Sequence, residues 1–110
     1  MIQEEKDRLG RLEKLRLSQV DPYPTEAKRT HTTHEALMQF ESLREKKQSV
    51  TLVGRVRLLR KHGGLTFGQI QDQSGIMQFA LKKDVIGDEP YDFFHETTDV
   101  GDFLEVTGIV

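Results

Sequence analysis

Phe67 is the side chain whose type and neighbours best suit the binding of a nucleic-acid base. In the run 65–71, a period of two places Thr66, Gly68 and Ile70 on one face and Leu65, Phe67, Gln69 and Gln71 on the other. If Ile70 faces a core, Phe67 is an aromatic ring on a polar face. A base can stack on such a ring while an amide side chain bonds its edge and cations bind the phosphates. The residues alone leave open an alternative, in which Phe67 packs beneath the helical part of the chain.

Basic side chains gather near this ring in the sequence. Arg60 and Lys61 precede the Gly63-Gly64 turn, and together with Arg57 they belong to a stretch, 48–71, that contains no acid. Residues 84–110 contain acids but no Lys or Arg. This division predicts a positive face on a chain whose net charge is only −2. Two alternatives to a phosphate-binding role remain open for these cations: Arg60 and Lys61 could be the solvated end of an ordinary hairpin, and the charges could be clustered by chance.

The histidines do not form a catalytic or metal-binding pattern. His31 and His34 are three residues apart, but a metal ion would need further ligands, and the chain has no cysteine. The sequence contains no Ser-His-Asp arrangement, glycine-rich phosphate loop or H-E-x-x-H motif. We therefore expect a binding segment with no catalytic residue, no metal site and no cofactor of its own.

Helical patterns precede the aromatic ring along the chain. Leucine spacing and good helix formers predict a helix over residues 2–18, which the prolines of Asp21-Pro22-Tyr23-Pro24 end. Thr32 and Glu35 form a capping-box pattern, so a second helix is expected from Thr32 to about residue 46.

After residue 48 the hydrophobic period changes to two. Strands are predicted over 50–59, 65–71, 76–81 and 103–110, with a short helix or turn over 91–95. Helices followed by a strand meander indicate an α+β fold, with a helical N-terminal extension over 1–47 and a β-barrel domain over 48–110. This order is typical of an OB-fold, a five-stranded Greek-key barrel, so its last strand is expected to be missing here. An SH3-like barrel is the alternative.

Length and composition limit the choice of protein class. The 110 residues suffice for one small domain, and the lack of cysteine fits a reducing compartment. The apolar runs are too short to span a membrane, and the first residues lack the apolar region of a secretory signal. We expect a cytoplasmic protein with no membrane partner.

Several short motifs, in a fixed order, resemble one family. They are Asp21-Pro22-Tyr23-Pro24, Arg29-Thr30-His31-Thr32, Val53-Gly54-Arg55, Ile70-Gln71-Asp72, Lys83-Asp84, Asp99-Val100-Gly101-Asp102 and Val106-Thr107-Gly108. Together with Phe67 and Gln78, they resemble the N-terminal anticodon-binding OB-fold domain of class II lysyl-tRNA synthetases. The resemblance implies binding to the anticodon loop of tRNA-Lys, whose central base is uridine. It also implies a homodimeric parent lysine–tRNA ligase, with ATP and Mg²⁺ bound in a catalytic domain outside this fragment.

The resemblance also implies roles at single positions. Arg60 is similar to the first-strand arginine that contacts the anticodon loop. Phe67 is similar to the aromatic that stacks on an anticodon base, and Gln78 to the amide that reads the edge of the central uridine. Lys61 and Arg57 are expected to add phosphate contacts.

Two departures from the family pattern and two alternatives accompany this interpretation. Ala80 stands where the family usually has an aromatic residue, and the family's fifth-strand glutamate is not found in this sequence. The anticodon-binding domains of aspartyl- and asparaginyl-tRNA synthetases read the same central uridine, and the segments 21–24 and 29–32 are what favour lysine. The other alternative is a stand-alone OB-fold protein that binds single strands without sequence preference. Such a protein should expose several aromatics.

Overall fold

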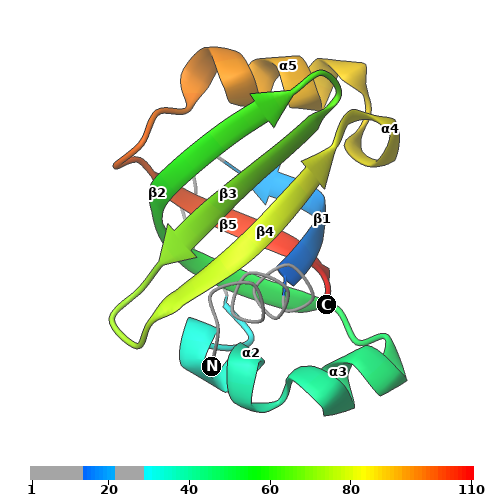
Figure 1. The fold of residues 1–110 in the computed structure, drawn as a ribbon, viewed down its shortest axis with the longest axis vertical. Coiled ribbons are helices and arrows are strands. Elements are labelled where there is room, and N and C mark those ends of the chain that lie inside the picture. Colours follow the sequence, from blue (N-terminus) through cyan, green and yellow to red (C-terminus); the bar gives the residue numbers. More distant parts are fainter. Residues whose placement is uncertain (1–13, 22–28) are drawn as a thin grey trace, which may run out of the picture.

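The described part of the chain folds into a closed β-barrel with a helical cap at each end (Figure 1). The computed structural model describes residues 14–21 and 29–110. The strands are β1 (Lys14–Asp21), β2 (Val50–His62), β3 (Leu65–Gln71), β4 (Ile76–Lys82) and β5 (Phe103–Ile109). The helices are α2 (Thr33–Met38), α3 (Phe40–Lys46), α4 (Lys83–Ile86) and α5 (Asp88–Thr97). The strands pair in the order β1-β4-β3-β2-β5, and the barrel closes between β5 and β1.

Alternating burial along the strands builds the core. On β3, Thr66 and Ile70 are fully buried, and on β4 the same holds for Met77, Phe79 and Leu81. The side chains between them are mostly half-buried on the outer face. Successive side chains of a strand point to opposite sheet faces. The alternation of apolar and polar residues along each strand therefore determines which side chains enter the core and which lie on the outer surface. The strands predicted after residue 48 are confirmed.

Strand β1 corrects two expectations. A helix was expected over 2–18, but residues 14–18 belong to a strand, and residues 1–13 lie outside the described part. The barrel was expected to lack its fifth strand, but β1 completes it, pairing parallel to β4 and antiparallel to β5. Leu15 and Leu17 alternate inward, and both are buried. Residues 14–21 gain backbone hydrogen bonds to the edges of β4 and β5 and bury two leucines in the core. These tertiary contacts outweigh the helix propensity of the segment, because propensity is a weak determinant compared with tertiary context.

The burial of Leu15 gives a test of this closure. Leu15 is 0% exposed and pairs with Phe79 of β4. We expect Leu15→Ala to lower the free energy of unfolding by about 2–5 kcal/mol, because it leaves a cavity in the core. The matched control is Gln19→Ala, at an exposed position of the same strand, which should change stability by less than about 0.5 kcal/mol. Equal, small effects in urea unfolding would show that β1 does not contribute to the core.

Two short helices cover the lower end of the barrel (Figure 1). The capping box is confirmed: the Glu35 amide donates to Thr32 Oγ1 over 3.1 Å, and the Thr32 amide donates to Glu35 Oε1 over 2.9 Å. The single helix expected up to residue 46 is instead divided at Gln39 into α2 and α3. This division lets Phe40 and Leu43 of α3 pack into the core.

Helix α5 covers the opposite end, where the sequence predicted a short helix or turn. Tyr91 and Phe94 of this helix are 1% exposed. The Tyr91 hydroxyl donates to the Gly63 carbonyl over 3.1 Å and lies 2.8 Å from Thr66 Oγ1. These bonds tie α5 to the β2–β3 turn, so the polar tip of a buried ring has partners.

Asp72 links the lower helices to the barrel. Its carboxylate accepts hydrogen bonds from the amide and hydroxyl of Thr33, both over 2.8 Å, and from the amide and hydroxyl of Ser74, over 2.8 and 2.7 Å. Partial burial raises the pKa of Asp72, but the hydrogen bonds from Ser74 and Thr33 outweigh it and lower the pKa to about 2. The charged carboxylate therefore holds α2 against the β3–β4 turn.

This depressed pKa predicts an acid-dependent loss of stability. The contribution of Asp72 is fully present above its ordinary pKa of 3.8 and is lost as pH falls toward its folded value of about 2. We expect Asp72→Ala to destabilise the fold by about 1–3 kcal/mol at pH 7 and to flatten the stability profile in this window. Gln73→Ala, at an exposed position of the same turn, is the control. Urea unfolding between pH 7 and 2 measures both effects, and an unflattened profile for the Asp72 variant would contradict the assignment.

Candidate nucleic-acid interface

The registers of β2, β3, β4 and β1 arrange the outer face of the barrel in rows. One row across the four strands reads Arg60, Phe67, Ala80, Arg16. The next row reads Leu58, Gln69, Gln78, Lys14. Phe67 and Gln78 are therefore diagonal neighbours on adjacent strands, and Arg60 lies directly beside Phe67. Diagonal pairs of this kind lie about 7–8 Å apart, within reach of aromatic and long side chains.

The ring of Phe67 lies half-buried on this outer face. The expected parity is confirmed, because Thr66 and Ile70 face the core. The next residue, Gly68, has no room for a side chain, since a Cβ there would collide with the ring of Phe79 inside the barrel. The Phe79 ring therefore fills the inner face of the sheet at Gly68, and the Phe67 ring lies on the outer face.

Two cationic or polar side chains surround this ring. Lys14 Nζ lies 4.6 Å from the ring centroid of Phe67, in cation–π geometry. The imidazole of His62 meets the same ring edge-on, with 6.5 Å between centroids. A base approaching the face that Lys14 occupies must displace its ammonium group or share the surface with it. Lys14 then becomes available to a phosphate.

A pocket of about 400 Å³ joins the predicted site residues, and we call it the Gln78 pocket. Arg60, Phe67 and Gln78 line it together with Gln69, His62 and Lys14, and none of the lining residues that belong to the described part of the chain is acidic. It therefore combines a ring for stacking, two amides for a base edge and cations for phosphate. Such a pocket suits a single-stranded nucleotide.

Lys61 and Arg57 lie apart from this pocket. Lys61 alternates to the opposite side of β2, and its Nζ lies 5.8 Å from the Tyr91 ring centroid, beside α5. There, burial lowers the pKa of His95, the charge of Lys61 lowers it further, and Asp92 acts in the opposite direction. Arg57 is exposed at a β-bulge between Val56 and Leu58 and does not line the Gln78 pocket.

Sequence reasoning missed the two cations that β1 adds to this face, Lys14 and Arg16. They lie in the segment expected to be helical, and only the period-two pattern of Leu15 and Leu17 pointed to a strand. Lys14 lines the Gln78 pocket. Arg16 pairs in register with Ala80 of β4, and Ala80 in turn pairs with Phe67 of β3.

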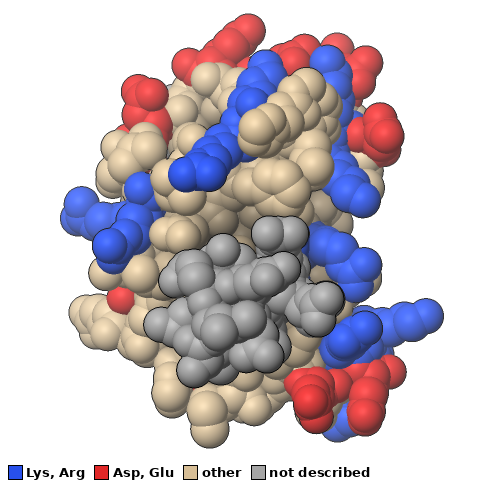
Figure 2. Space-filling view, viewed as in Figure 1, with Lys and Arg blue, Asp and Glu red and all other residues tan. Residues whose placement is uncertain are grey.

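Charge is divided between the faces and ends of the molecule (Figure 2). Acidic side chains gather over α5, which contains Asp88, Glu89, Asp92 and Glu96. Basic side chains border the sheet face below them. This arrangement gives the sheet a positive potential in a chain of net negative charge, as the sequence predicted.

Two further properties concern only the part of the chain that the structure describes. Within residues 14–21 and 29–110, no group of three or more His, Cys, Asp or Glu side chains could hold a metal ion. None of the helices in these ranges is long and apolar enough to cross a membrane.

Comparison with known proteins identifies the family. The model of the tRNA anticodon-binding family, described as an OB-fold nucleic acid binding domain, matches residues 50–110. The chain belongs to this family. A solved OBody bound to hen egg-white lysozyme superposes with a TM-score of 0.60 at 21% identity, covering 79% of this chain and 82% of that one. That likeness concerns the fold alone. The OB-fold prediction is thus confirmed over the SH3-like alternative.

Three curated relatives of this OB-fold chain are lysine–tRNA ligases. That of Roseiflexus sp. (strain RS-1) is 41% identical over 105 residues, or 94% of this chain and 22% of the relative. That of Carboxydothermus hydrogenoformans is 40% identical over 105 residues, covering 96% and 21%. The Bacillus cereus (strain AH187) ligase is 37% identical over 108 residues, covering 94% and 21%. The chain therefore spans about a fifth of the length of these relatives, and the resemblance to lysyl-tRNA synthetases is confirmed.

The position of Phe67 predicts how it affects folding. Because its ring lies on the outer face, Phe67→Ala should change the free energy of unfolding by less than about 1 kcal/mol. Phe79→Ala, one register position away but inside the barrel at 0% exposure, should cost about 3–5 kcal/mol. Urea unfolding of both variants provides the comparison. A loss of stability for Phe67→Ala as large as that for Phe79→Ala would exclude a ring available for stacking.

Proposed function

We propose that this OB-fold chain binds the anticodon loop of tRNA-Lys, as the anticodon-binding part of a lysine–tRNA ligase. The observation that supports this most directly is the convergence of Arg60, Phe67 and Gln78 on one pocket. The relatives at 37–41% identity, all lysine–tRNA ligases, favour lysine over the aspartyl, asparaginyl and stand-alone alternatives.

Each of the three side chains has a distinct task in this proposal. The Phe67 ring stacks on a base of the loop, which contributes affinity with little dependence on base identity. The amide of Gln78 lies diagonally across from it and bonds the edge of the central uridine, since an amide can both donate to and accept from a base edge. Arg60, beside Phe67, and Lys14, above the ring, contact the backbone phosphates.

Lys61 and Arg57 have a lesser part in this proposal than the sequence suggested. Both are exposed, so they add to the positive field that attracts RNA. Lys61 reaches the loop only if the RNA extends past the β2–β3 turn toward α5.

The chemistry of the parent ligase would take place outside this chain. Lysine–tRNA ligases join lysine to tRNA through an ATP-dependent step, and we infer that ATP and Mg²⁺ bind in a catalytic domain of the parent protein. The described residues do not fit a Mg²⁺ site of their own, as they lack a cluster of ligands. A homodimeric, cytoplasmic ligase is the context in which this domain would act.

The proposal predicts different failures for Phe67 and Gln78. Phe67→Ala should weaken binding of a tRNA-Lys anticodon stem-loop by about 5- to 150-fold, the equivalent of about 1–3 kcal/mol, and should weaken other anticodons equally. Gln78→Ala should mainly remove the preference for uridine over cytidine at the central position. Fluorescence anisotropy with stem-loops that differ only at that base measures both.

Phe103→Ala is the matched control for these measurements. Phe103 is an aromatic at 49% exposure on β5, with Arg55 6.0 Å from its ring centroid, so it resembles Phe67 in its surroundings but lies outside the Gln78 pocket. Its loss should leave binding unchanged. Equal binding of oligo-dT and the stem-loop would support the stand-alone alternative instead.

A further inference from the structure

A chain of hydrogen bonds joins helix α5 to the β2–β3 turn at the upper end of the barrel (Figure 1). His95 Nε2 lies 2.6 Å from Thr66 Oγ1, and the same hydroxyl lies 2.8 Å from the Tyr91 hydroxyl. The Tyr91 hydroxyl donates in turn to the carbonyl of Gly63 over 3.1 Å. Thr66 is 0% exposed, so its hydroxyl must find its partners within the protein. The chain therefore links β3, α5 and the turn.

The last acceptor fixes the direction of this hydrogen-bond chain. A carbonyl only accepts, so the single proton of the Tyr91 hydroxyl is donated to Gly63. The Tyr91 oxygen then accepts from Thr66, which uses the one proton of the Thr66 hydroxyl. Thr66 Oγ1 can therefore only accept from His95, which requires a proton on His95 Nε2. Neutral His95 satisfies the chain, and a second proton would bind Nδ1 and make the ring a cation.

The surroundings of His95 disfavour that cation. Its ring is half-buried against Tyr91 and Phe94, and the centroids of these rings lie 4.7 and 5.2 Å from its own. Burial lowers the pKa of His95 below its ordinary value of 6.5, and the charge of Lys61 lowers it further. Asp92 raises the pKa but does not offset the other two causes. The junction is therefore built for a neutral imidazole.

Charged groups from three elements lie around this junction. Lys61 of β2 and Lys83 of α4 each place Nζ 5.8 Å from the Tyr91 ring centroid. Asp92 of α5 attracts a charged imidazole, but its Oδ1 already lies 3.6 Å from Lys83 Nζ in a salt bridge. Glu96, the other acid beside the imidazole on α5, is exposed to solvent. A proton on the imidazole thus adds a third positive charge around Tyr91.

The β2–β3 turn connects this junction to the outer face of the sheet. The Gly64 carbonyl accepts from the amide of Lys83, the first residue of α4, over 2.8 Å. Just before the turn, His62 meets the Phe67 ring edge-on, with 6.5 Å between centroids. A change in the docking of α5 therefore acts on the turn through the bond to Gly63.

We propose that His95 is a pH-sensitive switch, which holds α5 on the β2–β3 turn while its imidazole is neutral and loosens α5 when it is protonated. This inference goes beyond the proposed function, because it concerns the cap of the barrel and not the Gln78 pocket. A loosened α5 exposes the imidazole to water, where it binds a proton more readily than in the docked state.

The docked state is therefore fully favoured above pH 6.5, the ordinary pKa of the group. It loses stability as pH falls below 6.5 toward the lower pKa of His95 in the folded chain. In this window the equilibrium between loosened and docked α5 should shift by up to about tenfold per pH unit, because the loosened state binds one more proton.

NMR spectra of the 110-residue chain between about pH 8 and 5, the range in which histidine changes charge, test the switch. The imidazole of His95 should titrate with a midpoint below 6.5. The amide resonances of Gly63, Gly64 and Thr66 should shift with the same midpoint. Hydrogen-exchange protection factors of α5 should fall by up to about tenfold per pH unit over the same window.

Four variants separate the switch from a merely structural role. His95→Gln keeps an N–H donor for Thr66 but does not titrate, so the turn amides should stop responding to pH. Lys61→Gln removes the cation that opposes protonation and should raise the His95 midpoint toward 6.5, whereas Asp92→Asn should lower it. His34→Gln is the matched control, because His34 is an exposed histidine of α2 at the opposite end of the barrel, and it should change neither quantity.

Two results would overturn the switch. One is a pH response of the turn amides that persists in His95→Gln. The other is a His95 midpoint at or above 6.5 that Lys61→Gln does not move. If His95→Gln failed to fold, Lys61→Gln and Asp92→Asn would still decide the question, because both substitutions are at exposed positions. Midpoints of His95 and of the turn amides that moved together in these two variants would support the switch, and midpoints that moved apart would reject it.

Discussion

The pairing of β1 with both β4 and β5 is the interaction on which the rest of the structure depends. Without it, both of these strands would present unpaired backbone groups at an open edge. With it, the core gains Leu15 and Leu17, both buried. The close approach also explains Gly108, where any Cβ would collide with the backbone carbonyl of Arg16. Closure thus requires glycine on β5 and an apolar alternation on β1.

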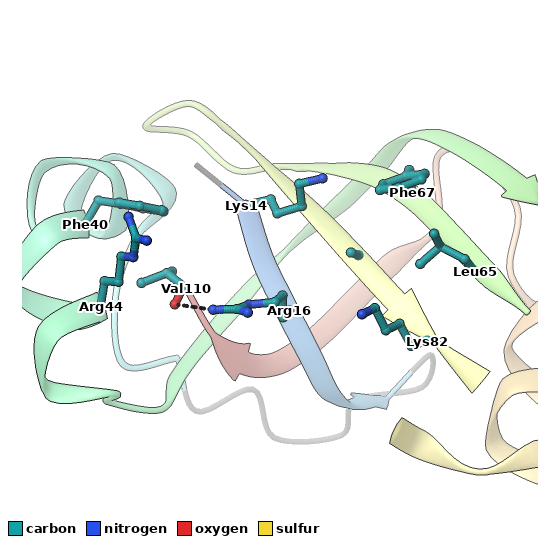
Figure 3. Close-up of a pocket in the computed structure, with 9 residues that line it drawn as sticks. Lys14, Arg16, Phe40, Arg44, Leu65, Phe67, Lys82 and Val110 are labelled. Atoms are coloured by element: carbon teal, nitrogen blue, oxygen red, sulfur yellow. Dashed lines mark hydrogen bonds between the residues drawn. The ribbon is translucent and has the colours of Figure 1, made fainter. Parts of the chain in front are cut away.

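Closure also decides which side chains meet on the outer face. The parallel register places Lys14 beside Gln78 and Arg16 beside Ala80, which brings two cations to the strand next to the candidate site (Figure 3). The same strands turn their apolar side chains inward. The residues that stabilise the fold and the candidate binding residues therefore lie on opposite faces of one sheet. Phe79 and Phe67 illustrate the division: one ring fills the barrel and the other lines the Gln78 pocket. Binding residues can therefore vary with little consequence for the core.

The ends of the barrel serve a different purpose from its wall. Asp72 holds α2 against one end through Thr33, and Tyr91 holds α5 against the other through Thr66 and Gly63. The acids of α5 lie at the end of the molecule away from α3, so they leave the sheet face with its positive field (Figures 1 and 2). A local field of this kind attracts polyanions even when the net charge of the chain is −2.

The sequence by itself determined the features that depend on local periodicity and local hydrogen bonds. The alternation around Ile70 predicted both the strand and the outward position of Phe67, and the Thr32 and Glu35 pair predicted a helix start that the structure contains. These features need only neighbours along the chain. Only the tertiary structure decided that residues 14–21 form a strand, that Lys61 lies beside Tyr91 instead of Phe67, and that Arg44 lines a pocket with Phe67. The physical reason is that each of these depends on contacts between segments far apart in the chain. The strand edges that pair with residues 14–21 form only when the barrel assembles. The distance between a cation and an aromatic ring on another element is likewise set by the closed barrel.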